Sequence, residues 1–263
     1  MVWLTSQPIG LLVLGCLAIA LLFAVGSRLA ARALVPESEQ EAAHAVAAPL
    51  MSPLGAAFAI LAALTLANEA GFLTSAQGIV SNEAADASRL AWASTMPDVR
   101  PAPIQARLRT YLQATRLHEW HGANAAEGSD TPTIRAVAHL ERVVRTQAAR
   151  PDLGTPTSTE LLTALDSLTN DRRARLAAAS REPPTFYVIT LAVSGLALIA
   201  GAAALTIRAG RRVAVLVGGL TVVVGLSMAL ILVLGNPWRG TTFVSGHPID
   251  VVIHDLGTGY FHP

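Results

Sequence analysis

The chain has 263 residues and a formal net charge of +1, and only 14% of its residues are charged while 52% are apolar. Soluble domains carry roughly 25% charged residues, so this composition excludes an ordinary soluble globular protein. The net charge of +1 is by itself uninformative about function. With one cysteine, Cys16, the chain forms no intramolecular disulfide and no thiolate metal cluster.

Two long apolar runs lie near each end of the chain, at residues 9–25, 50–67, 186–207 and 213–234, and none of the four contains Asp, Glu, Arg or Lys. A bilayer core of about 30 Å requires about 20 apolar residues in a helix, and each run meets or approaches that length. We therefore predict an all-α integral membrane protein with four transmembrane helices in a 2+2 arrangement. The predicted spans are residues 9–26, 50–69, 185–207 and 213–234.

The first apolar run has an alternative interpretation as a signal peptide, because Ala31-Arg32-Ala33 offers a cleavage-like site after it. No basic residue precedes the run, and the run is longer than the usual apolar core of a signal peptide. We expect a retained first span. It forms the first transmembrane pair, residues 1–70, together with the second span.

The second span is predicted to continue beyond the bilayer as one helix, because no proline occurs between Asn68 and Ser94. A helix from Leu54 to Ser94 would be about 60 Å long, twice the hydrocarbon thickness. Its continuation carries a stripe of small side chains that would permit close helix packing. Packing within the chain explains the stripe equally well. The stripe consists of Ala76, Val80, Ala84, Ala87 and Ala91.

Residues 71–183 are predicted to form a helical extramembrane domain, since apolar residues recur there at helical spacing in three further segments. The third segment is expected to start at Thr157, whose spacing to Glu160 matches a capping box. Residues 184–235 then form a second transmembrane hairpin with a five-residue connection. Residues 236–263 are expected to be a polar C-terminal tail.

The distribution of arginine does not orient the protein. Five arginines lie in the two short links and five lie near the membrane in the central segment. Short links usually dominate, which would place them in the cytoplasm and the central domain outside. The first set is Arg28, Arg32, Arg208, Arg211 and Arg212, and the second is Arg89, Arg172, Arg173, Arg175 and Arg181.

One face of the second span is the candidate functional surface. Glu69 is the one acidic residue close behind a span, where burial of a charge is costly and often functional, although a position in the interface is the alternative. The face around it would line a pore or bury against neighbouring helices, and both interpretations stay open. It comprises Phe58, Leu61, Thr65, Asn68, Glu69 and Phe72.

Histidines invite a metal-site interpretation that their spacing does not favour. His118 and His121 are three residues apart, whereas a zinc-protease helix has them four apart. His247, His254 and His262 in the tail have no fixed ligand spacing. We expect no metal site, no cofactor and no catalytic residue. The arginine-rich helices also carry acidic residues, which is typical of a solvated face rather than of nucleic-acid binding.

Several short motifs occur in a fixed order with the 2+2 spans over roughly residues 50–250. The second span leads into Val80-x-x-Glu83-Ala84 and Leu90-Ala91. Arg109-x-Tyr111 precedes Glu119-Trp120, and Leu165-x-x-Leu168 precedes Arg172 to Leu176. Asn236-Pro237-Trp238-x-Gly240 follows the last span and leads to Val244 and Pro248. In this order, the motifs and the 2+2 spans resemble the bestrophin-like family of bacterial membrane proteins, including the ending after its last span.

The resemblance implies a pentameric anion channel of the bacterial plasma membrane, since bestrophins are pentamers whose second span lines the pore. It implies that Phe58, Leu61 and Thr65 face the axis and that the central helical domain is cytoplasmic. This chain differs from an anion channel in one respect, because a ring of Glu69 side chains near the pore mouth would repel anions. The alternative function is a non-conducting scaffold or sensor whose helical domain binds a protein partner.

Overall fold

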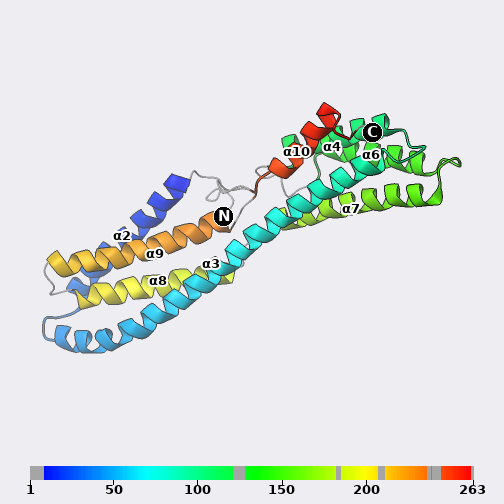
Figure 1. Cartoon of the computed structure of the whole chain (residues 1–263). Coiled ribbons are helices and arrows are strands. Elements are labelled where there is room, and N and C mark those ends of the chain that lie inside the picture. The colour runs from blue at the N-terminus through cyan, green and yellow to red at the C-terminus, as the bar shows by residue number, and fades with distance from the viewer. Residues whose placement is uncertain are drawn as a thin grey trace. The chain divides into compact units, whose positions relative to one another are not determined.

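The computed structural model describes residues 9–120, 128–181, 185–206, 211–235, 238 and 244–261, and these contain helices and no strand (Figure 1). The all-helical class predicted from the sequence is confirmed. In chain order the helices are α2 (Ile9–Leu34), α3 (Gln40–Ala93), α4 (Pro101–His118), α6 (Thr131–Ala148), α7 (Thr155–Ser180), α8 (Thr185–Leu205), α9 (Arg211–Leu234) and α10 (His247–Thr258).

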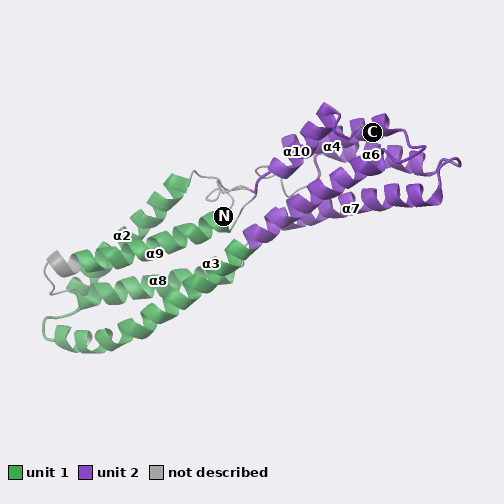
Figure 2. Ribbon diagram, viewed as in Figure 1, with its two compact units in different colours: residues 1–71, 182–236 green, residues 72–181, 237–263 purple. Residues whose placement is uncertain are grey.

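The chain divides into two compact units, which Figure 2 colours separately. Unit 1 comprises Met1–Gly71 and Glu182–Asn236, and therefore contains α2, the first part of α3, α8 and α9. Unit 2 comprises Phe72–Arg181 and Pro237–Pro263. Helix α3 contributes to both units because it continues without interruption from Gln40 to Ala93.

Apolar helices make up unit 1. Among the described residues, four stretches are long and apolar enough to cross a membrane. In such helices every backbone N–H and C=O is satisfied internally, so the apolar side chains can face lipid. A small core in which Phe58, Leu191, Ile199 and Val224 are buried joins α3, α8 and α9. The four stretches lie in α2, α3, α8 and α9.

Helix α3 starts earlier than the sequence analysis expected. It begins at Gln40, whereas the predicted span begins at residue 50, and it contains Pro49 and Pro53 in its first part. Proline is tolerated inside membrane helices because local adjustments satisfy the freed backbone groups again. With 54 residues the helix is roughly 80 Å long, so the predicted continuation far beyond one bilayer thickness is present.

Unit 2 has a larger core, formed by α3, α4, α6, α7 and α10. The small-residue stripe of α3, from Ala76 to Ala91, is buried in this core. Helix α6 begins at an N-cap, Asp130, whose carboxylate accepts a hydrogen bond from the Thr133 backbone N–H. The capping box predicted at Thr157 is wrong, because α7 begins two residues earlier, after Gly154.

The tail after residue 236 contains α10, which packs with unit 2 rather than standing apart. Its Asp250 carboxylate accepts two hydrogen bonds from the Arg116 guanidinium of α4, at 2.7 and 2.9 Å. Gln77 of α3 exchanges hydrogen bonds with the backbone of Ser245 just before α10. After the helix, the Phe261 carbonyl accepts from the buried Gln105 side chain. These contacts tie the end of the chain to α3 and α4.

Candidate functional site

The face of α3 that lies inside unit 1 is formed by four side chains at helical spacing. Phe58, Ala62, Thr65 and Glu69 are 5, 6, 8 and 2% exposed. The Thr65 hydroxyl donates to the carbonyl of Leu61 one turn earlier, at 2.7 Å, so it needs no partner on another helix. These residues are buried against the chain's own helices.

Phe58 is held in a tight junction between α3, α8 and α9. A Cβ atom placed on Gly195 of α8 would lie 3.1 Å from the Phe58 ring and 2.8 Å from Val224 of α9. Both distances are shorter than ordinary side-chain contacts, so only glycine leaves room for the ring at this crossing. The close approach of the three helices therefore depends on Gly195.

The opposite face of α3 has no partner among the described residues of unit 1. Ile60 and Leu64 are 60 and 65% exposed, and Asn68 and Gly71 are exposed as well. With 3.6 residues per turn these positions fall on one line, turned away from Phe58 and Glu69. This exposed α3 face is apolar at Ile60 and Leu64 and polar at Asn68, and it carries no acidic residue.

The residues predicted to share one pore-facing surface therefore divide between two faces of α3. Phe58, Thr65 and Glu69 lie on the buried face, and Leu61 is half-buried between the two. Asn68 belongs to the exposed face. The sixth residue, Phe72, is in unit 2, where the guanidinium carbon of Arg181 lies 4.0 Å from its ring centre.

Unit 2 contains a second polar site, a buried network of charges centred on Arg175 of α7. Arg175 Nε lies 2.7 Å from Glu83 Oε2 of α3, and its Nη2 lies 3.1 Å from Glu119 Oε2 after α4. Arg172 donates to the other oxygen of Glu119, and the Tyr111 hydroxyl donates to Glu83 Oε1 at 2.6 Å. Two carboxylates and two guanidiniums balance, so the network is neutral as a whole.

The network shifts the pKa of its members in the directions expected for a dry site. Burial, and then the negative charge of Glu83, raise the pKa of Tyr111 well above its ordinary value. Burial by itself lowers the pKa of Arg175, but Glu83, Tyr111 and Glu119 together raise it above the usual guanidinium value. Tyr111 therefore remains a neutral donor, and Arg175 remains charged.

Beside this network, two carboxyl groups meet across α3 and α7. Burial, followed by a hydrogen bond with Asp86 and the charges of Asp86 and Glu83, raises the pKa of Asp171 to about 6. One Asp171 oxygen is buried. With this raised pKa, Asp171 takes up a proton at mildly acidic pH, because burial and the adjacent negative charges disfavour its ionised form.

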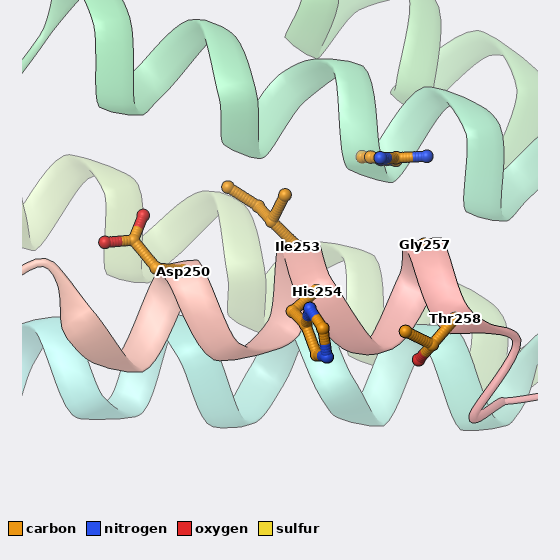
Figure 3. Close-up of a pocket in the computed structure, with 6 residues that line it drawn as sticks. Asp250, Ile253, His254, Gly257 and Thr258 are labelled. Carbon is orange, nitrogen blue, oxygen red and sulfur yellow. The ribbon is translucent and has the colours of Figure 1, made fainter.

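The histidines do not converge on a metal site among the described residues. His118 Nδ1 lies 3.9 Å from Asp130 Oδ1, and His121 and His262 fall outside the described residues. His254 lines an open pocket on α10, where Figure 3 shows Asp250 and Ile253 pointing to one side of the helix and His254 and Thr258 to the other. The carboxylate of Asp250 is occupied by Arg116.

The model of the bestrophin-like domain family matches residues 18–249 of this chain. The chain belongs to the bestrophin-like family. Three solved structures share the fold with TM-scores of 0.69 to 0.71 at 12 to 14% identity. One is a point mutant of a bacterial bestrophin homologue from Klebsiella pneumoniae, at 13% identity, covering 93% of this chain and 98% of that chain.

The other two are crystal structures described as membrane proteins, at 12 and 14% identity. They cover 93 and 95% of this chain, and 97 and 99% of their own chains. No curated protein matches the chain. At these identities the structures establish a shared bestrophin-like fold.

The short motifs that carried the resemblance to bestrophin-like proteins meet in the Arg175 network. Arg175 joins Glu83 to Glu119, and the Tyr111 hydroxyl donates directly to Glu83. Sequence reasoning missed this convergence. One signal was present: Glu83 falls on the same line of α3 as Val80 and Ala87, and a charge on an apolar face requires a buried partner.

Proposed function

We propose that this bestrophin-like protein is an oligomeric, four-span anion channel of the bacterial plasma membrane, and that the exposed α3 face lines its pore. The observation that supports this is the division of α3 into two faces. Ile60, Leu64 and Asn68 are open on a single chain, whereas the opposite side of the same helix is packed. Copies arranged around an axis would turn this face towards the pathway.

Burial of Glu69 removes the main electrostatic objection to anion conduction. A ring of Glu69 carboxylates at the pore would repel anions, but the side chain is only 2% exposed and lies on the packed face. The exposed α3 face offers anions the Asn68 amide instead, which is a neutral hydrogen-bond donor. The preference for anions itself rests on family membership.

Cysteine accessibility in a conducting preparation tests this assignment. With the sole cysteine replaced by Cys16→Ser, Leu64→Cys is expected to give a chloride current that an anionic methanethiosulfonate reagent blocks. Phe58→Cys, on the packed face of the same helix, is the matched control and should not respond. Native mass spectrometry of the same preparation should show an assembly of several copies.

Two outcomes would contradict the proposal. Absence of conductance over a wide range of voltage and pH, together with a monomeric mass, would exclude a channel and leave the scaffold alternative. Block at Phe58→Cys without block at Leu64→Cys would place the pore on the face first predicted from the sequence.

A further inference from the structure

Two cavities follow one another along a groove between α2, α8 and α9 within unit 1. The first, of about 240 Å³, lies between Ala20, Ile199 and Val224. The second, of about 230 Å³, includes the residues one helical turn further on each helix, Ala24, Ala203 and Thr221. Helix α3 contributes no residue to either cavity, so the groove is separate from the exposed α3 face.

The two cavities differ in chemistry. Apart from the thiol of Cys16, only hydrocarbon and thioether side chains and glycine line the first. The second is lined in part by three polar residues, Arg28, Thr206 and Thr221. Both hydroxyls donate to carbonyls of their own helices, so Arg28 is the charged donor of this cavity. The groove is thus apolar along its length and cationic at one end.

Two glycines of α9 shape this groove. A Cβ atom on Gly225 would lie 3.0 Å from the Leu17 side chain and 3.4 Å from Ala20 Cβ, so glycine allows α2 and α9 to approach closely there. A Cβ atom on Gly218, in the second cavity, would have no neighbour within 4 Å. The absence of a side chain at Gly218 therefore leaves the cationic end open.

We propose that this groove binds one anionic glycerophospholipid, with its phosphate against Arg28 and an acyl chain along the apolar cavity. The groove lies among membrane-spanning helices, so the surrounding solvent is lipid itself. Lipid tails are as apolar as leucine, so the acyl chain gains van der Waals packing rather than hydrophobic energy. Selectivity therefore comes from the charge, because a basic pocket between membrane helices favours an anionic head group. This inference does not depend on conduction.

Native mass spectrometry of the full-length protein, titrated with palmitoyl-oleoyl phosphatidylglycerol or phosphatidylcholine, measures this binding. The wild type should retain phosphatidylglycerol preferentially. Arg28→Gln should weaken phosphatidylglycerol binding by about fivefold, the contribution of one arginine near a membrane surface, and leave phosphatidylcholine binding unchanged. The control is Arg32→Gln, one turn further along α2 and outside both cavities, which should bind as the wild type does.

Filling the groove gives a second test that leaves the charge in place. Gly218→Leu should reduce lipid retention to the level of Arg28→Gln or below. Gly219→Leu, the neighbouring position with equally open space but outside the cavity, should not. Equal retention of both lipids, or equal losses for Arg28→Gln and Arg32→Gln, would show non-specific annular lipid and overturn the proposal.

Cross-linking of the wild type tests the position without any variant. Phosphatidylglycerol with a photoreactive diazirine on one acyl chain should mark residues of the first cavity, among them Ala20, Leu196 and Met228. Adducts spread over the exposed side of α2, at Leu14 and Leu22 for example, would exclude a defined groove site.

Discussion

At the residue scale, Arg175 compensates two carboxylates that are otherwise removed from water. Arg175→Leu would leave Glu83 and Glu119 buried without their main partner, and we expect a loss of about 3–5 kcal/mol in the stability of unit 2. Arg173→Leu, on an exposed position of α7, should change stability by about 0.5 kcal/mol or less. Thermal unfolding followed by circular dichroism in detergent compares the two. Equal unfolding temperatures would show that the network contributes nothing to stability.

Asp171 gives a pH dependence whose sign follows from its raised pKa. The folded value of about 6 lies above the ordinary 3.8, so the folded chain holds this proton more tightly than the unfolded chain does. The resulting stabilisation is complete below about pH 4 and is lost as the pH rises through 6. The unfolding temperature of the wild type should therefore decline between pH 4 and 7. Asp171→Asn should remove the part of this decline that comes from Asp171.

The control for this pH prediction is Asp166→Asn, an exposed carboxyl on the same helix, which should keep the wild-type profile. Hydrogen bonds from Arg89 lower the pKa of Glu160. The contribution of Glu160 to stability therefore changes at more acidic pH, outside the range in which Asp171→Asn and the wild type are compared. A wild-type profile in Asp171→Asn would mean that folding does not raise the pKa of Asp171.

At the element scale, α3 has a packed face and an exposed face. Gly195 of α8 allows the packed face to approach α8 closely at Phe58. Gly195→Ala would press a methyl group against Phe58 and Val224, and such overpacking typically costs about 1–3 kcal/mol. Gly219→Ala on α9, where the added methyl meets no neighbour within 4 Å, should be neutral. Unfolding temperatures in detergent check the pair. A neutral Gly195→Ala would show that α3 and α8 can separate without cost.

At the scale of the whole molecule, two compact units with separate cores share one helix. The apolar unit accounts for residence in the membrane, and the other has a core and a buried ion network typical of a folded domain. A pore face exists only when copies surround an axis, so the proposed function belongs to an assembly. The bestrophin-like fold extends through both units, because the family match covers residues 18–249.

Membrane residence, the helical class and the long α3 were predictable from the sequence, because a bilayer requires uninterrupted apolar runs and a helix continues where no proline breaks it. The side of α3 that packs against α8 and α9 could not be predicted from the sequence. Periodicity of 3.6 places Phe58 and Thr65 on one face and Leu64 on another, but it does not show which face meets α8 and α9. The convergence of Glu83, Glu119 and Arg175 was equally hidden, because burial brings together charges that are far apart along the chain.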